Sequence, residues 1–280
     1  MHRKVMIKVI VVLLAAVGNC WGGCCARSLA GQRQETAKPD TAGAVLEQLN
    51  QKTRELQSYQ CRIEHLFRQP AFESETLKKG DLYYQRDGKK SKLRLNLKTL
   101  KQDEDKEQKY IEHYIFNGDW VTDAGYRFEG IWLTHIDYQI KAVKCHQLAE
   151  PNDPNTPADT FELVSRNFPI IGFSRTEDLK KQFEIELVDE KEKRAADFAH
   201  LHLKVKPDSV YKDDYTSMDF WIDNKVGLPA KIEAVSVQGD IYHIKLLKAR
   251  VNEEIDKKAF EVRIPEGFGK PQIVPLSRKE

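Results

Sequence analysis

From residue 58 onwards, hydrophobic and polar residues alternate along most of the chain, which is the pattern of half-buried β-strands. In the segment 59–67, Tyr59, Cys61 and Ile63 share one face, and the polar residues between them occupy the other. The same period predicts strands at 59–67, 80–86, 92–98, 110–116, 120–123, 125–143, 183–188, 198–206, 218–223, 228–237 and 240–250. Because hairpin turns join most of these segments directly, we expect one strongly curved antiparallel sheet of about eleven strands.

Helical patterns are few and short. Asp40 or Thr41 is suited to cap a helix whose apolar face includes Val45 and Leu49. Two more helical segments are expected, at about 159–167 and 176–182. The fold class predicted from the pattern is therefore mainly β with a few helices.

The first 30 residues have the features of a signal peptide. A basic start is followed by Val9–Gly18, a continuous apolar run of ten residues, which fits the hydrophobic region of a signal peptide. Small residues mark a cleavage site after Ala30, and a second candidate lies after Ala26. We therefore expect an exported, periplasmic protein.

The remaining chain divides into three parts. Residues 31–40 are polar and are predicted to form a linker, residues 41–270 hold the folded domain, and residues 271–280 form a C-terminal tail. Membrane attachment as a lipoprotein through Cys20 or Cys24 is the alternative to a free periplasmic protein, because each follows a partial lipid-attachment pattern.

Two cysteines remain after the leader, Cys61 and Cys145. An even number of cysteines in an oxidising compartment permits a disulfide between them. Two separate buried thiols fit the sequence equally well.

Charge argues against nucleic-acid binding. The chain has 45 basic and 43 acidic residues, and the first 30 residues contain four basic residues and no acidic one, which leaves 41 against 43. A body without excess positive charge lacks the field that attracts a phosphate backbone.

Catalytic and metal-binding patterns are weak in this sequence. His200 and His202 share a strand face with Lys204 and Lys206, and two neighbouring ammonium groups disfavour a bound cation. His113 and His135 are single histidines in strands, and the sequence has no metalloprotease, nucleophile-elbow or phosphate-loop motif. We predict a protein that is not an enzyme and uses no metal or cofactor.

Several local patterns, in order, resemble the LolA family of periplasmic lipoprotein carriers and their LolA/LolB-like relatives. After the N-terminal amphipathic helix, residues 80–86 (GDLYYQR) resemble a strand of the family with the pattern Gly-Asp/Glu-Leu-aromatic-x-x-Arg. Residues 114–120 (YIFNGDW) and 220–232 (FWIDNKVGLPAKI) resemble two of its hairpins. Residues 259–267 (AFEVRIPEG) resemble its final strand and exit.

The resemblance implies an unclosed half-barrel whose concave face is covered by a helical lid. It implies a non-enzymatic carrier or chaperone that holds lipoprotein acyl chains or another lipid, with an inner-membrane export complex as donor and an outer-membrane acceptor as partners. The alternative is an envelope sensor or structural module that binds a protein with the same fold. With this resemblance, we expect a cavity lined by inward-facing residues of three strands: Leu82, Tyr84, Leu93, Leu95, Leu97, Tyr114 and Phe116. The alternating pattern alone fits a packed core equally well or better.

Two further features concern how such a cavity would open. Arg86 lies on the same strand face as Leu82 and Tyr84, and the family resemblance implies that it holds the lid closed through backbone carbonyls at a helix end. The alternative is an arginine at a strand end that turns to solvent and pairs with Asp87. The apolar segment 168–173 is too rich in proline and glycine for a helix, so we expect it to plug the cavity mouth or contact a partner, with core packing as an equal alternative. Its large apolar side chains are Phe168, Ile170, Ile171 and Phe173.

Overall fold

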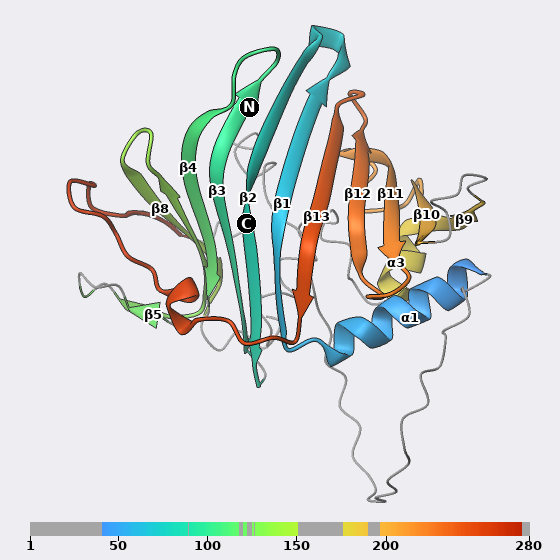
Figure 1. Ribbon diagram of the computed structural model, residues 1–280, viewed down its shortest axis with the longest axis horizontal. Coiled ribbons are helices and arrows are strands. Elements are labelled where there is room, and N and C mark those ends of the chain that lie inside the picture. The colour runs from blue at the N-terminus through green and yellow to red at the C-terminus, as the bar shows by residue number, and fades with distance from the viewer. Residues whose placement is uncertain are drawn as a thin grey trace, which may run out of the picture.

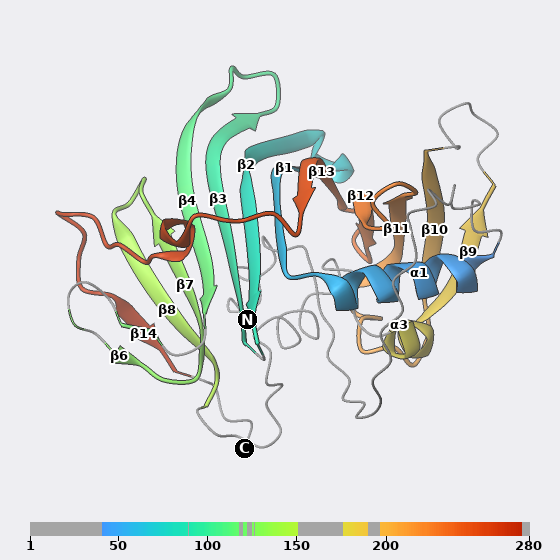
Figure 2. The same ribbon diagram turned by 60° about the horizontal axis from the view of Figure 1, so that its bottom comes forward.

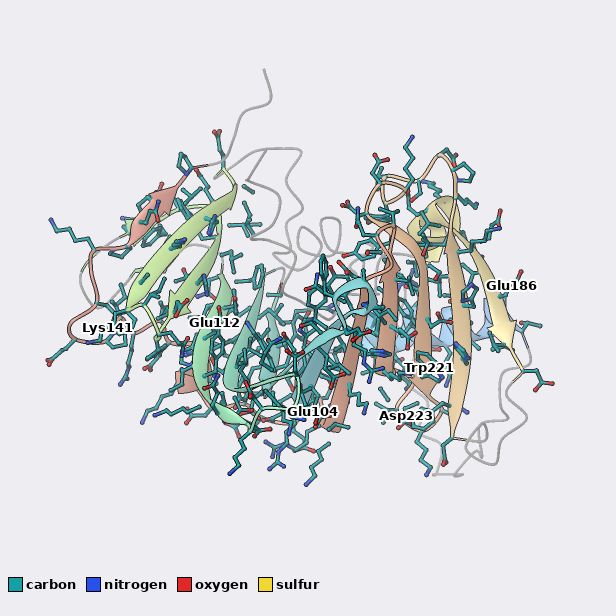
Figure 3. The ribbon with its side chains drawn as sticks, turned by 90° about the horizontal axis from the view of Figure 1, so that it is seen from above. Glu104, Glu112, Lys141, Glu186, Trp221 and Asp223 are labelled. Carbon is teal, nitrogen blue, oxygen red and sulfur yellow. The ribbon has the colours of Figure 1, made fainter. Side chains whose placement is uncertain are left out.

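A computed structural model describes residues 41–88, 90–117, 120–121, 125, 127–150, 176–189 and 197–275. One large open sheet dominates it, and the sheet curves without closing (Figures 1 and 3). The predicted fold class, a mainly β half-barrel with few helices, is confirmed. The expected signal peptide, the linker, the helix at 159–167 and the segment 168–173 lie outside the described residues.

The sheet contains twelve strands in the order β14-β8-β7-β4-β3-β2-β1-β13-β12-β11-β10-β9. A separate pair, β5 and β6, forms a second small sheet. The strand bounds are β1 Ser58–Gln69, β2 Ser74–Asp87, β3 Lys90–Gln102, β4 Gln108–Asn117, β5 Trp120–Val121, β6 Arg127–Phe128, β7 Ile131–Asp137, β8 Ala142–Ala149, β9 Phe183–Val188, β10 Phe198–Val205, β11 Tyr215–Asp223, β12 Pro229–Ser236, β13 Ile241–Val251 and β14 Gln272–Val274.

The longer helix, α1 (Ala42–Glu55), begins where the sequence predicts. The Thr41 hydroxyl accepts a hydrogen bond from the Ala44 amide at 3.1 Å, which satisfies one of the free amides at the helix start. Val45, Leu46 and Leu49 are buried and turn the apolar side of α1 toward the sheet. The short helix α3 (Thr176–Gln182) packs nearby through Leu179, and two 3₁₀ turns, η1 (Pro70–Phe72) and η4 (Lys257–Phe260), complete the described elements.

The two faces of the sheet have separate cores. We define the inner face as the one that packs with α1; it carries Tyr59, Leu82 and Phe220 and forms one large hydrophobic cluster. The outer face carries a second cluster on β4, β7 and β8, which the C-terminal segment covers with Val262 and Phe268. Arg94 fixes that segment, since its Nη1 donates to the carbonyls of Ala259 at 3.1 Å and Glu261 at 2.6 Å.

The sequence-based strand assignments are wrong in three places. The stretch 125–143 is not continuous, because the Asp137 carboxylate accepts from the amides of Gln139 and Ile140 and forms a turn between β7 and β8. The final strand expected near 259–262 is instead η4, which Asp256 caps by accepting from the Lys258 amide at 2.9 Å. The sheet is also not wholly antiparallel, since β14 pairs with β8 in parallel.

The β11–β12 hairpin approaches α1 closely. Gly227 adopts a positive φ of 73°, as the sequence pattern suggests, and a Cβ there would lie 2.6 Å from Cγ of Lys52 in the helix.

None of the described helices is long and apolar enough to cross a lipid bilayer.

Gly80 is predicted to be essential for pairing β2 with β3. The register shifts between Lys79 and Gly80, and a Cβ at Gly80 would lie 2.0 Å from the backbone oxygen of Asn96. We expect Gly80→Ala to lower the free energy of unfolding by more than about 2 kcal/mol, because backbone must move to admit a methyl group. Urea denaturation at pH 7 measures this.

The matched control is Gly43→Ala in α1. The nearest heavy atom to a Cβ there is the Thr41 hydroxyl oxygen at 4.0 Å, and alanine favours helix by about 0.5–1 kcal/mol over glycine. Equal stability of the two variants would show that the close approach at Gly80 relaxes without cost.

Candidate ligand-binding face

The seven predicted cavity residues come together on the inner face. The strand register places Tyr84 opposite Leu93, which in turn lies opposite Phe116. Leu82, Leu95 and Tyr114 form the next row in the same way. We call this set the apolar band: Leu82, Tyr84, Leu93, Leu95, Leu97, Tyr114 and Phe116.

The apolar band is closed in this structure. Its side chains are between 0% and 7% exposed, and all seven belong to the main hydrophobic cluster. A ligand therefore has to displace the groups that cover the band before it can contact it. Whether the band lines a cavity remains a prediction.

Arg86 lies at one end of the apolar band, where α1 meets β1. Its Nη1 donates to the Arg54 carbonyl in the last turn of α1 at 3.0 Å, and its Nε donates to the Tyr84 hydroxyl at 3.2 Å. Carbonyls in the last helical turn have no partner within the helix, so the guanidinium acts as a cap for α1. Nη2 is buried and has no hydrogen-bond partner among the described residues.

Asn252, which directly follows β13, forms hydrogen bonds at the same joint between α1 and the sheet. Its side-chain amide donates to the Glu55 carbonyl at 3.3 Å, and its side-chain oxygen accepts from the Gln57 amide at 2.7 Å. The Arg86 amide also donates to the Gln57 carbonyl at 2.7 Å. The C-terminal end of α1 is thus tied to two strands, and its angle to the sheet is set by bonds at this joint.

A polar cluster that the sequence analysis missed lies at the other end of the apolar band. Glu112 of β4, labelled in Figure 3, is at its centre and is buried on the inner face. Its carboxylate receives Lys78 Nζ at 2.9 Å, the Tyr114 hydroxyl at 2.9 Å and His135 Nε2 at 3.1 Å. Lys78 Nζ also donates to the Tyr110 hydroxyl at 3.4 Å. We call Lys78, Tyr110, Glu112 and His135 the Glu112 cluster.

The bonds within the Glu112 cluster keep its carboxylate ionised. Burial alone would raise the pKa of Glu112, but the hydrogen bond from His135 and the charge and hydrogen bond of Lys78 lower that pKa to about 2. His65, opposite Lys78 on β1, shows the reverse effect, because burial and the Lys78 charge lower the pKa of its imidazole to about 4. The Glu112 cluster therefore holds the charged pair Lys78 and Glu112, and the neutral imidazole of His65 lies beside it on β1.

A signal for this cluster was present in the sequence. Lys78 has the same strand parity as Leu82 and Tyr84, and Glu112 has the parity of Tyr114 and Phe116. The predicted second strand began at residue 80, whereas β2 begins at Ser74, so Lys78 was not counted. Charged residues are also rarely buried, which hides such positions from a pattern based on hydrophobicity.

The oxygen and nitrogen ligands of Glu112, His135 and Asp137 lie within 4.8 Å of one another, which is close enough for a metal ion. The Lys78 ammonium lies 2.9 Å from the Glu112 carboxylate and occupies the position of a cation. Two backbone amides already bind the Asp137 carboxylate. This arrangement suits hydrogen bonding to a ligand better than metal coordination.

Cys61 and Cys145 do not form a disulfide. Both are free and buried, with Cys61 in the inner-face cluster and Cys145 in the outer-face cluster. The sheet separates their side chains, so no bond can join them without breaking strand pairing.

His200 and His202 lie on the outer face of β10, as predicted. Both bond to the same oxygen of Asp219 on β11, through His200 Nε2 at 2.8 Å and His202 Nδ1 at 2.9 Å. The His200 ring also stacks on Trp221, with ring centroids 4.3 Å apart. These histidines are cross-strand partners, and four strands of the sheet separate β10 from β2 of the apolar band.

Comparison by sequence finds no matching family model and no matching curated protein. Among solved structures, the chain is similar in fold to an uncharacterized conserved protein from Thermus thermophilus, with a TM-score of 0.45 and 9% identity over 84% of this chain and 99% of that chain. It is similar to MucB, with a TM-score of 0.45 and 10% identity over 79% of this chain and 62% of that chain. It is also similar to the LolA superfamily protein NE2245 from Nitrosomonas europaea, with a TM-score of 0.32 and 12% identity over 80% of this chain and 99% of that chain.

Acid is expected to destabilise the fold in two stages. The pKa of His65 and that of His113 are about 4, against an ordinary value of 6.5, so the unfolded chain binds more protons between these pH values. Stability should fall by roughly 1–3 kcal/mol per histidine as the pH decreases from 6.5 to 4. Glu112 contributes stability above pH 4.5 that is lost as the pH falls toward 2.

Urea denaturation of the wild type and of His65→Gln/His113→Gln at pH 7, 5.5 and 4 measures the first stage. The double variant should lose less stability than the wild type over this range, whatever its stability at pH 7. If the free energy of unfolding decreases by the same amount with pH in both proteins, His65 and His113 are not the groups responsible for the first stage.

Proposed function

We propose that this protein is a non-enzymatic periplasmic carrier that holds acyl chains of lipoproteins or another lipid against the apolar band, with α1 acting as a lid. An inner-membrane export complex as donor and an outer-membrane acceptor belong to the same proposal. The observation that supports it most is the extent of the apolar inner face relative to the helix that packs on it.

The extent of that face follows from simple dimensions. A helix of 14 residues is about 21 Å long, whereas twelve strands spaced by about 4.8 Å extend over roughly 50 Å. In Figures 1 and 2, α1 runs beneath the half of the sheet from β13 to β9 and does not lie over β3 and β4. The part of the apolar band on β3 and β4 is therefore not covered by α1, and an acyl chain is a chemically suitable occupant once it displaces the groups that bury the band.

A carrier must also release what it binds. Burial of an acyl chain contributes about 0.8 kcal/mol per methylene, so a chain of ordinary length would bind too tightly without a competing state. The closed joint provides that state, because the bond from Arg86 to the Arg54 carbonyl stabilises α1 in its position when no ligand is bound. In this proposal Arg86 is a latch that opens for cargo and closes on release.

Native mass spectrometry of protein purified from its own host without detergent tests the carrier. We expect a fraction of the protein to retain a lipid or acylated peptide, and the retained mass identifies the cargo class. Protein that carries no lipid, together with no micromolar binding of a fluorescent acyl probe, would remove the carrier function. A co-purifying protein in place of lipid would support the alternative, a sensor or structural module.

Arg86→Leu is expected to bind an acyl probe about tenfold more tightly than the wild type and to release it more slowly to an acceptor. Hydrogen bonds to charged groups contribute about 1.5–3 kcal/mol, and here that energy stabilises the ligand-free state only. Equilibrium fluorescence binding and stopped-flow transfer to vesicles measure the two effects.

Two further variants serve as controls for the Arg86→Leu experiment. Arg86→Lys retains the charge but not the planar group, so it should fall between the wild type and Arg86→Leu. Arg68→Leu removes an exposed arginine that pairs with Glu75 at 3.0 Å, and it should behave as the wild type. If Arg86→Leu transfers the probe at the wild-type rate, Arg86 is not a latch.

A further inference from the structure

The Glu112 cluster is placed where a ligand on the apolar band would end. Along β2, Arg86 and Lys78 are eight residues apart, which corresponds to about 26 Å of strand. Leu82 and Tyr84 lie between them on the same face. A chain that lies along the strands would therefore have the α1 joint at one end and the Glu112 cluster at the other.

The cluster is costly as a purely structural feature. The Lys78 side chain is 13% exposed and that of Glu112 is 6% exposed, so both charges are largely removed from water. Buried ion pairs of this kind can usually be replaced by apolar residues without loss of stability. Their position on an otherwise apolar ligand face points to a role in binding.

Among the described residues, the charges at inner-face strand positions near the cluster balance. Inner-face positions on adjacent strands hold two cations, Lys78 and Lys144, and two carboxylates, Glu112 and Asp137. The imidazoles of His65 and His146 both have a pKa lowered by burial, and a neighbouring positive group adds to that effect. A ligand group with a net charge would leave one charge unbalanced in this partly buried site.

The cluster can both donate and accept hydrogen bonds. The hydroxyl of Tyr110 accepts from Lys78, and its own proton is directed to the Glu112 carboxylate. Lys78 has three donor hydrogens, of which two are directed at Glu112 and Tyr110. Hydroxyl, ester and amide groups match this mixture of donors and acceptors.

Building on the proposed carrier function, we propose that the Glu112 cluster binds the uncharged polar head of an acylated ligand, such as a glycerol ester or an amide. The acyl chain then lies along the apolar band and points toward the α1 joint. Glu112 and Lys78 hold the head through hydrogen bonds, and their mutual charge balance excludes free fatty acids and amines.

A series of head groups on one chain length tests this in the wild-type protein. Monooleoylglycerol, oleate and oleylamine are used at pH 7.5 to displace a fluorescent acyl probe. We expect monooleoylglycerol to compete at least about tenfold better than either charged compound, since it keeps the head-group hydrogen bonds without adding charge. Oleate or oleylamine competing as well or better would overturn the proposal.

Two double variants test whether the Glu112 cluster is the site that binds the head group. Lys78→Met/Glu112→Leu removes the head-group hydrogen bonds, and should bind monooleoylglycerol about tenfold more weakly than the wild type while it still rejects the two charged compounds. The matched control is Lys231→Met/Glu233→Leu on the outer face, where Lys231 and His243 contact Glu233 at 3.4 Å and 2.9 Å. The control should keep the wild-type preference.

The outcomes separate the two proposals. If neither the probe nor any of the three compounds binds to the protein, the carrier function fails and this inference fails with it. If all three bind without preference in the wild type, or Lys78→Met/Glu112→Leu binds monooleoylglycerol as tightly as the wild type, the carrier stands and only the head-group site is wrong. The wild-type series decides the matter even if the cluster variant does not fold.

Discussion

A short helix on a wide sheet is the constraint around which the rest of this molecule is arranged. Twelve strands present far more inner surface than α1 can cover, and the buried residues of that surface still form a single cluster. On the outer face, the C-terminal segment covers the apolar residues: it crosses β3 and β4 and is fixed there by Arg94. On each face an arginine side chain donates to backbone carbonyls: Arg94 holds the C-terminal segment on the outer face, and Arg86 holds α1 on the inner face.

How α1 is held is decided at its C-terminal end. Only Leu56 and Gln57 separate α1 from β1, so this end cannot move far from the sheet. Arg86 from β2 and Asn252 after β13 bond to the last carbonyls of the helix, and both bonds act close to the pivot. Small changes at a pivot produce large displacements at the opposite end of a rigid helix, so two hydrogen bonds can govern access to the inner face from β13 to β9, which α1 covers.

Much of this arrangement could be predicted from the sequence, and the failures have physical causes. β9 has the predicted bounds, because its period-two pattern ends sharply at both sides. The inner-face residues and Arg86 were found since β2 alternates without interruption after Gly80. η4 and β14 were missed because they depend on contacts with distant strands, and the inward orientation of Lys78 and Glu112 was missed because charge normally indicates solvent.

Two groups of lysine, glutamate and histidine on opposite faces show how burial changes the meaning of the same side chains. The Glu233 side chain is 24% exposed, so water also stabilises the charges of that group. Around Glu112 the carboxylate is 6% exposed, so its charge has to be balanced almost wholly by Lys78 and by hydrogen bonds. The inner group therefore responds strongly to any polar atom placed beside it. In the proposed carrier, this group and the bonds at the α1 joint would confine a bound chain to the apolar stretch between them and favour an orientation along the strands.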